Sequence, residues 1–374
     1  MLYKYMMDLG YGIDDIEYIR NTYPLNECVD DTILKYVKCF HSFFLEFNLN
    51  NKDIRRMLSN NPSICCYSVD SLRKKIDDML ELGYSLKNIL NIFLIKCNVL
   101  GYSINSIKQK IDYLIGRGFS KRDVIKMTTN FPFILGFSIN NIEQKINDMI
   151  NMGYTDKQVV RMIKLYPNLF YCCKIDNIIS RLNKIIDLGY TKREVIKMTA
   201  SFPALYGYSV DNMKLKISEL ISLGFTELEV RKMTIVLPTL FGYSIDKIQT
   251  KINDMVNLGY KREDVLCMIK TLPALIGSSI DSIMLKLDFY DSIGIKDLLI
   301  TCPKKMIQSV ELSYARYMYF KFLGKELDES NSSLLFLDQK QFIKRFGKSN
   351  KDLTEEYKYS DSIDIKNNIK KLSI

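Results

Sequence analysis

Basic side chains recur at a fixed spacing along this chain, and they are the residues best placed to do chemistry. One column lies eight residues before a repeated glycine and holds seven cations: Lys75, Lys110, Lys145, Arg181, Lys216, Lys251 and Lys286. A second column, eight residues after the glycine position, includes Arg56, Lys126, Arg161, Lys197 and Lys232. Evenly spaced cations suit the phosphates of a nucleic acid, which release counterions when they are neutralised. The columns predict phosphate contacts that do not depend on base sequence.

Both columns also have a structural interpretation. Lys145 falls at the flank of its helix's apolar stripe, where a lysine stem can cover the core while its ammonium group stays in water. The second column points away from the core of its helix and could be a solvated face. Basic pairs in the first turn of a helix oppose the helix dipole, which is a weak sign of anion binding: Lys121-Arg122, Lys192-Arg193 and Lys261-Arg262.

Other kinds of chemistry find little support. With His41 as its one histidine, the chain has almost no means of building a histidine-based metal site or a Ser-His-Asp triad, and His41 lies in an apolar segment typical of a core. The vicinal pairs Cys65-Cys66 and Cys172-Cys173 lack metal-ligand spacing and indicate buried thiols in a reducing compartment. Paired carboxylates, a P-loop and a dinucleotide-binding glycine pattern do not occur. We expect a protein that is not an enzyme and has no cofactor or metal.

The spacing of the columns follows from an internal repeat of about 35 residues. Its marker glycines are Gly83, Gly118, Gly153, Gly189, Gly224, Gly259 and Gly294. Prolines lie 14 residues after five of them, at Pro132, Pro167, Pro203, Pro238 and Pro273. We count roughly nine units, beginning at positions 10, 48, 83, 118, 153, 189, 224, 259 and 294. The repeat predicts an all-α fold in which each unit buries its stripe against its neighbours, an α-solenoid.

Each unit is predicted to be two helices and a tight return. The first helix begins after a serine N-cap such as Ser138 and ends at a glycine, which accepts the left-handed conformation just past a helix. The second helix begins with a capping box, as at Thr191 and Glu194, and carries a column of buried methionines. Proline ends it. The aromatic residue after each glycine is interpreted as a staple at the start of the second helix. We expect residues 1–308 to form the repeat array and residues 309–374 a C-terminal helical cap and tail.

These motifs together resemble the mitochondrial transcription termination factor (mTERF) family. The resemblance covers roughly residues 1 to 357 and includes the tail, where Ser309 to Leu312 lead to Arg316 and Phe342 to Phe346 lead to Asp352 and Tyr357. It implies a curved, left-handed superhelix whose units each have two α-helices and a short 3₁₀ helix. It also implies a basic inner surface that tracks double-stranded nucleic acid, and no enzymatic activity.

The net charge of +10 agrees with an anionic partner, although lysine-rich composition alone could come from coding bias. Coding bias has no 35-residue period. We predict a monomeric double-stranded DNA-binding protein of the mTERF type, acting in transcription and its termination, with Arg316 added to the two columns as a contact. A protein-interaction scaffold and an RNA-binding factor are the alternatives. No targeting peptide or membrane-spanning run is visible, so we expect the cytoplasm of a bacterial type of cell or an organelle, and no membrane partner.

Overall fold

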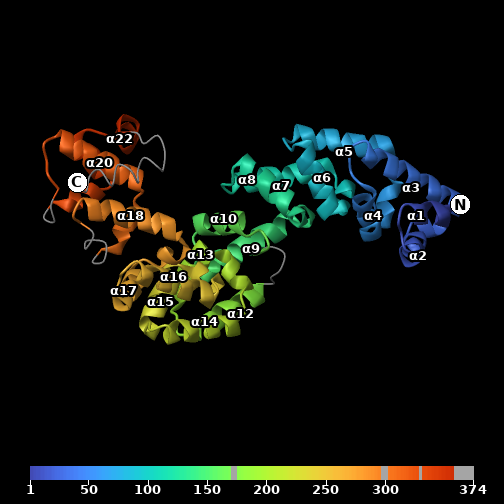
Figure 1. Cartoon of the computed structure of the whole chain (residues 1–374). Coiled ribbons are helices and arrows are strands. Elements are labelled where there is room, and N and C mark those ends of the chain that lie inside the picture. The colour runs from blue at the N-terminus through green and yellow to red at the C-terminus, as the bar shows by residue number, and fades with distance from the viewer. Residues whose placement is uncertain (170–174, 296–301, 328–330, 358–374) are drawn as a thin grey trace. The chain divides into compact units, whose positions relative to one another are not determined.

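The computed structural model describes residues 1–169, 175–295, 302–327 and 331–357, and over these ranges the chain is all-helical without strands (Figure 1). The predicted order of two α-helices and a 3₁₀ return is confirmed in unit after unit. No helix in the described ranges combines the length and the apolarity that a membrane crossing requires.

The first helices of successive units share a buried apolar stripe, and α5, α7, α9, α14, α16 and α18 also share a serine cap. They are α1 (Leu2–Asp8), α3 (Asp30–Leu45), α5 (Val69–Glu81), α7 (Ile104–Gly116), α9 (Ile139–Met152), α12 (Ile175–Ile186), α14 (Val210–Ser222), α16 (Ile245–Asn257) and α18 (Ile280–Ser292). The serine hydroxyls that we predicted as N-caps accept backbone N–H bonds, as Ser68 Oγ does from Ser71 and Ser138 Oγ from Asn141. Gly83 and Gly153 end two of these helices with φ values of +97° and +113°, the region that glycine tolerates.

The second helices are mostly shorter, and α8, α10, α13 and α15 begin with the predicted capping boxes. They are α2 (Ile13–Asn21), α4 (Asn51–Asn60), α6 (Leu86–Ile95), α8 (Lys121–Asn130), α10 (Asp156–Leu165), α13 (Lys192–Ser201), α15 (Glu227–Val236) and α17 (Arg262–Thr271). Reciprocal bonds join Ser120 to Asp123 and Thr226 to Glu229. The methionine column is buried, with Met198 and Met233 fully inaccessible to solvent, and this confirms its role in packing.

The returns are short 3₁₀ helices, most of which start at the repeated proline. They are η1 (Leu25–Glu27), η2 (Pro62–Cys66), η3 (Cys97–Gly101), η4 (Pro132–Gly136), η5 (Pro203–Gly207), η6 (Pro238–Gly242), η7 (Pro273–Gly277) and η8 (Pro303–Ile307). The glycine that closes a return leaves room for a tyrosine from the unit before. A Cβ on Gly242 would lie 2.7 Å from the hydroxyl oxygen of Tyr208, so any larger residue there would displace the ring.

The C-terminal elements follow α18 and break the repeat pattern. They are α20 (Val310–Phe322), η9 (Ser332–Phe336), α21 (Gln339–Phe346) and α22 (Asn350–Glu356). Helix α20 packs against α18 and α22. A single hydrophobic cluster extends from Leu220 in the repeats to Leu353 in α22. The boundary at residue 308 stays a prediction.

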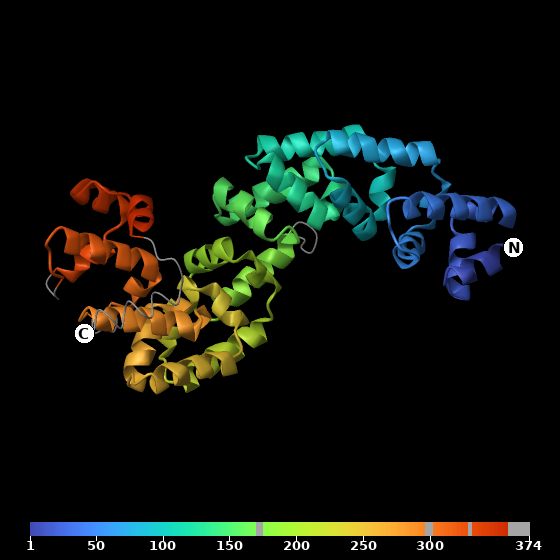
Figure 2. The same ribbon diagram turned by 45° about the horizontal axis from the view of Figure 1, so that its top comes forward.

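The helices form two compact units: residues 1–183 with 199–206, and residues 184–198 with 207–374. Within the first unit, first helices contact one another in the order α3, α5, α7, and second helices in the order α2, α4, α6, α8. Within the second unit the same holds for α14, α16, α18 and for α15, α17. Figure 2 shows this stacking of successive helices from a second direction. Each compact unit therefore has one layer of first helices and one layer of second helices.

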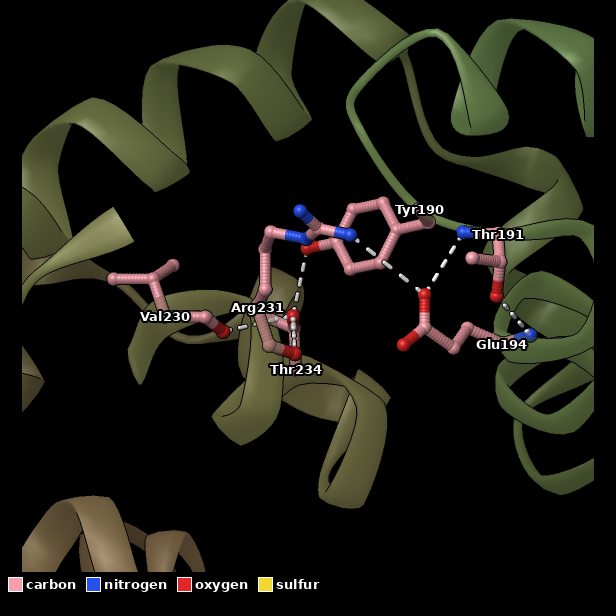
Figure 3. Close-up of polar contacts among 6 residues, drawn as sticks. All are labelled: Tyr190, Thr191, Glu194, Val230, Arg231 and Thr234. Atoms are coloured by element: carbon pink, nitrogen blue, oxygen red, sulfur yellow. Dashed lines mark hydrogen bonds and ion pairs between the residues drawn. The ribbon is translucent and has the colours of Figure 1, made fainter. Parts of the chain in front are cut away.

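Buried tyrosines bind threonines of the following repeat, a link that the staple interpretation did not include. The hydroxyl groups of Tyr190 and Thr234 lie 2.7 Å apart, and Thr234 also donates to its own helix at Val230 O (Figure 3). The same bond, with oxygen atoms 2.7 Å and 2.5 Å apart, joins Tyr84 to Thr128 and Tyr154 to Thr199.

Where the tyrosine column holds phenylalanine, the threonine column holds isoleucine. Phe119 corresponds in register to Ile163, and Phe225 to Ile269; all four side chains are buried. In these five pairs a polar residue in one column accompanies a polar residue in the other, and an apolar residue accompanies an apolar one. Tyr11 departs from the pattern: its register partner is Leu58, and its hydroxyl meets His41 instead. This matching is what a buried contact requires, because a lone buried hydroxyl would lose its bonds to water.

Candidate nucleic-acid interface

Charge separates between the two helix layers. In α4, α6, α8, α10, α13, α15 and α17, fifteen exposed residues are cations and three are acids. In the first helices α5, α7, α9, α12, α14, α16 and α18, six exposed residues are cations and eleven are acids. The net charge of +10 is therefore concentrated on the second helices. Their exposed cations, which we call the basic face, are Lys52, Arg56, Lys87, Lys121, Arg122, Lys126, Lys157, Arg161, Lys164, Lys192, Arg193, Lys197, Lys232, Arg262 and Lys270.

The second predicted column lies entirely within this basic face. Arg56 on α4, Lys126 on α8, Arg161 on α10, Lys197 on α13 and Lys232 on α15 are all exposed. Helical geometry explains their position, since each of these residues lies away from the buried methionine and the buried valine or isoleucine of the same helix. The basic pairs of the first turn, such as Lys121-Arg122, are also exposed and extend the face toward the start of each helix.

Three members of the first predicted column, Lys75, Lys110 and Lys286, reach from a first helix to the 3₁₀ return that follows the next second helix. Lys110, Lys216 and Lys251 are only 8–9% exposed. Lys110 Nζ donates to Leu135 O in η4 at 2.6 Å, and burial lowers the pKa of this lysine. The aliphatic stem packs in the core while the ammonium group satisfies a carbonyl at the end of a 3₁₀ helix.

Lys75 and Lys286 repeat this arrangement, and other members of the first column make different contacts. Lys75 donates to Tyr102 O and Lys286 to Met306 O, and burial lowers the pKa of both. Lys216 Nζ pairs with Glu219 Oε2 at 2.6 Å. Lys145 Nζ lies 5.0 Å from the centre of the Phe137 ring. Arg181 is half-buried on α12. These contacts support the structural interpretation of the first column, and its nucleic-acid role stays a prediction.

Arg316 lies inside the C-terminal elements and not on their surface. Its side chain is 1% exposed, and the guanidinium donates to Leu335 O at 2.8 Å and to Leu337 O at 2.7 Å. It also donates to Asn350 Oδ1 at 2.8 Å, and its Cζ lies 4.3 Å from the Phe342 ring centre. Burial lowers its pKa to about 10. Contrary to the sequence expectation, this residue has no exposed group for a phosphate, because its donors join α20 to η9 and α22.

The acids beside the basic face form hydrogen bonds at the start of their own helices and ion pairs with cations of the next unit. Asp123, third in α8, accepts from the backbone N–H and the hydroxyl of Ser120 and pairs with Lys164 of α10 at 2.7 Å. The lysine first, and Ser120 second, lowers the pKa of Asp123 to about 2. Glu229 of α15 pairs with Lys270 of α17 at 2.9 Å. These carboxylates consequently stay ionised, and Lys164 and Lys270 are partly neutralised members of the face.

Glu194 shows the same arrangement in Figure 3. It accepts from the backbone N–H of Thr191 at 2.8 Å and faces Arg231 of the next unit at 3.8 Å. The Thr191 bond, more than the arginine, lowers the pKa of Glu194. The capping boxes could be predicted from the sequence. The ion pairs that the same carboxylates form with the next unit could not, because each partner cation is 37 to 41 residues away.

The described residues contain no group of three His, Cys, Asp or Glu side chains that could hold a metal ion. His41 is buried on α3, with Nε2 2.8 Å from the hydroxyl of Tyr11, and burial lowers its pKa to about 4. Cys65 is buried and Cys66 half-buried, both as free thiols, whereas Cys172 and Cys173 lie outside the described residues.

The comparisons with known proteins add one match. No curated protein matches the sequence. The model of the mTERF family matches residues 4–222 and 222–343, nearly the whole chain. Members of that family bind nucleic acid in organellar gene expression and are not enzymes. On this match and on a helical repeat that agrees with it, the chain belongs to the mTERF family.

Proposed function

We propose that this protein binds double-stranded DNA through the basic face of its second helices and so regulates transcription. The observation that carries the proposal is the separation of charge, with fifteen exposed cations against three acids on the second helices α4 to α17, and six against eleven on the first helices α5 to α18. A surface that serves only solubility would have both signs interspersed. One strongly positive layer favours a polyanion as its partner.

The repeat spacing fits the even charge of a nucleic-acid backbone. Packed helices lie about 8–10 Å apart, whereas phosphates follow one another every ~3.4 Å of axis along each DNA strand. A cation on a second helix therefore has a phosphate close by wherever a strand faces the protein. The basic face contains more lysines than arginines, and this favours contacts with the phosphate backbone over recognition of base edges.

Further parts of the proposal concern assembly and location. We propose that residues 1–308 supply the binding array, that residues 309–374 close its end, and that the protein acts as a monomer. Membership of the family favours an organelle over the cytoplasm as the place of action.

A salt titration tests the function. Fluorescence anisotropy would follow binding of the full chain to a random-sequence DNA duplex, an RNA duplex of the same length, and single strands of each. We expect the DNA duplex to bind most tightly, with an affinity that falls steeply as salt rises. If the RNA duplex or an RNA single strand bound more tightly than the DNA duplex, RNA and not DNA would be the ligand. An absence of salt-dependent binding to every probe would contradict nucleic-acid binding and favour a protein-interaction scaffold.

A further inference from the structure

The second helices end in exposed uncharged residues that lie among the cations of the basic face. Each is the last residue of its helix and follows the second predicted column by four positions. In the first compact unit these residues are Asn60 on α4, Ile95 on α6, Asn130 on α8 and Leu165 on α10, and we call them the uncharged strip. Ile95 and Leu165 are 38% and 56% exposed, and both asparagines are exposed. The strip therefore places amides and aliphatic side chains on a surface whose charged residues are mostly cations.

Cations flank the strip along each helix. Residues four apart lie on one face of a helix, so a cation precedes three of the four members by one turn: Arg56, Lys126 and Arg161. Asn91 takes this position on α6, and its Nδ2 donates to Thr129 O on α8 at 3.1 Å. The column position on one helix thus lies beside the last turn of the next helix, where Asn130 follows Thr129. The pair of Lys164 with Asp123, at 2.7 Å, likewise joins the last turn of α10 to α8.

Contact with water explains the cations but not the aliphatic members of the strip. A single exposed aliphatic residue is common on a protein surface. Here the same register holds Ile95, Leu165 and, in the second compact unit, Val236, which is 67% exposed. This recurrence indicates a partner that has charged and uncharged parts side by side. Duplex DNA is such a partner, because its sugars and base edges lie between two rows of phosphates. When the cations bind phosphates, side chains about 6 Å further along the helix face the sugars and the bases.

The side chains of the strip match one class of base pair. Asparagine forms paired hydrogen bonds with N6 and N7 of adenine, and an aliphatic side chain contacts the C5 methyl group of thymine. Guanine is typically read by arginine or lysine and cytosine by a carboxylate, and the strip contains none of these. In the part of the chain that the structure describes, the amides of Asn60 and Asn130 have no hydrogen-bond partner, so both are available to a base.

We propose that the uncharged strip contacts base edges in the major groove and makes the protein prefer A·T-rich duplex DNA. This inference rests on the duplex binding proposed above, in which the cations hold the phosphates while the strip reaches the bases. Asn60 and Asn130 each hydrogen-bond an adenine, and Ile95 and Leu165 each pack on a thymine methyl group. The preference comes from these four residues, because cations that neutralise phosphates bind every sequence alike.

Two duplexes of equal length, one A·T-rich and one G·C-rich, test the proposal with the full chain by fluorescence anisotropy. At one salt concentration the unsubstituted protein should bind the A·T-rich duplex about tenfold more tightly. A strip variant carries four changes: Asn60→Ala, Ile95→Ala, Asn130→Ala and Leu165→Ala. It should bind both duplexes equally and keep the same salt dependence, because no phosphate contact is lost. The matched control should retain the preference, since it changes exposed residues of the same types on first helices of the same unit: Asn140→Ala, Asn147→Ala, Leu45→Ala and Leu80→Ala.

Modified bases separate the two kinds of contact. Deoxyuridine in place of thymidine removes the C5 methyl group, so it should weaken binding of the unsubstituted protein but not of a variant with Ile95→Ala and Leu165→Ala. Likewise, 7-deazaadenine lacks the N7 acceptor, so it should weaken binding of the unsubstituted protein but not of a variant with Asn60→Ala and Asn130→Ala.

Two results would overturn the role of the uncharged strip. One is equal, salt-dependent binding of both duplexes by the unsubstituted protein, which would show that the basic face holds phosphates without contact to base edges. The other is a preference for A·T-rich DNA that survives in the strip variant, or disappears in the matched control as well; the cations would then recognise the shape of A·T-rich DNA. Failure of the duplex proposal looks different, because neither duplex would then bind to any of the proteins.

Discussion

Replacing Tyr190 with phenylalanine should lower the free energy of unfolding only slightly. In a protein that already carries Thr234→Val, the same replacement should not lower it further. The two hydroxyl groups bond across neighbouring repeats at 2.7 Å in a buried site, and burial raises the pKa of Tyr190 (Figure 3). After Tyr190→Phe, Thr234 still donates to Val230 O at 2.9 Å. Only one neutral hydrogen bond is lost, so we expect a loss of about 1 kcal/mol in the free energy of unfolding.

Thr234→Val is the more damaging single change. It leaves the Tyr190 hydroxyl buried without its partner, and this costs about 1–3 kcal/mol. In the double variant neither hydroxyl remains, and the pair becomes apolar on both sides, as the chain already has at Phe225 and Ile269. The double variant should therefore be more stable than the sum of the single changes predicts, by about 1–2 kcal/mol of coupling energy.

Urea unfolding followed by far-ultraviolet circular dichroism measures all four proteins, since helix content is the signal and the chain has no tryptophan. Ser218, exposed on α14, offers a control: Ser218→Ala combined with Tyr190→Phe should show no coupling. Additive losses for Tyr190 and Thr234 would refute the view that matched columns hold neighbouring repeats together.

Two further substitutions test buried groups. His41 has a pKa of about 4 in the native protein and is protonated more easily in the unfolded chain, so the free energy of unfolding should fall by about 2 kcal/mol from pH 7 to pH 5. His41→Gln should remove this part of the pH dependence. If chemical unfolding of the variant shows the same dependence of stability on pH, the assignment to His41 is wrong. Arg316→Lys keeps the charge but lacks the fork that reaches Leu335 O and Leu337 O together, so we expect about 3 kcal/mol of destabilisation and faster amide exchange in residues 332–357, with α1 to α8 unchanged. A native exchange pattern together with weaker nucleic-acid binding would instead restore Arg316 as a surface contact.

The architecture could be predicted from the sequence because helix ends are local. Ser138, Gly153 and return prolines such as Pro132 set the ends of their helices through neighbours a few residues away, and the structure confirms them. The Tyr190–Thr234 bond could not be predicted in this way, since its partners are 44 residues apart. A comparison of the two columns within the chain, tyrosine with threonine and phenylalanine with isoleucine, contains the signal that would have found it.

The candidate site was predicted in composition but not in position. Regular spacing identified both cation columns but does not separate them. Lys110 of the first column is buried and donates to a carbonyl, whereas Lys126 of the second column is exposed. Whether such a lysine is buried depends on the direction of its side chain around the helix relative to the 3₁₀ return. For Lys110 that direction is set by how η4 packs on α7. Arg316 shows the same limit, because a family-like tail motif does not reveal whether an arginine points outward or into the core.

The salt dependence of duplex DNA binding tests the central claim most directly. One triple variant removes cations from the basic face: Lys126→Gln, Lys197→Gln and Lys232→Gln. A matched triple removes as many exposed lysines from first helices: Lys74→Gln, Lys108→Gln and Lys214→Gln. If each residue of the first set contacts one phosphate, the slope of log affinity against log salt should become shallower by about three, while the matched set leaves the slope unchanged. Equal slopes for the two triple variants would contradict the assignment of the second helices as the nucleic-acid interface.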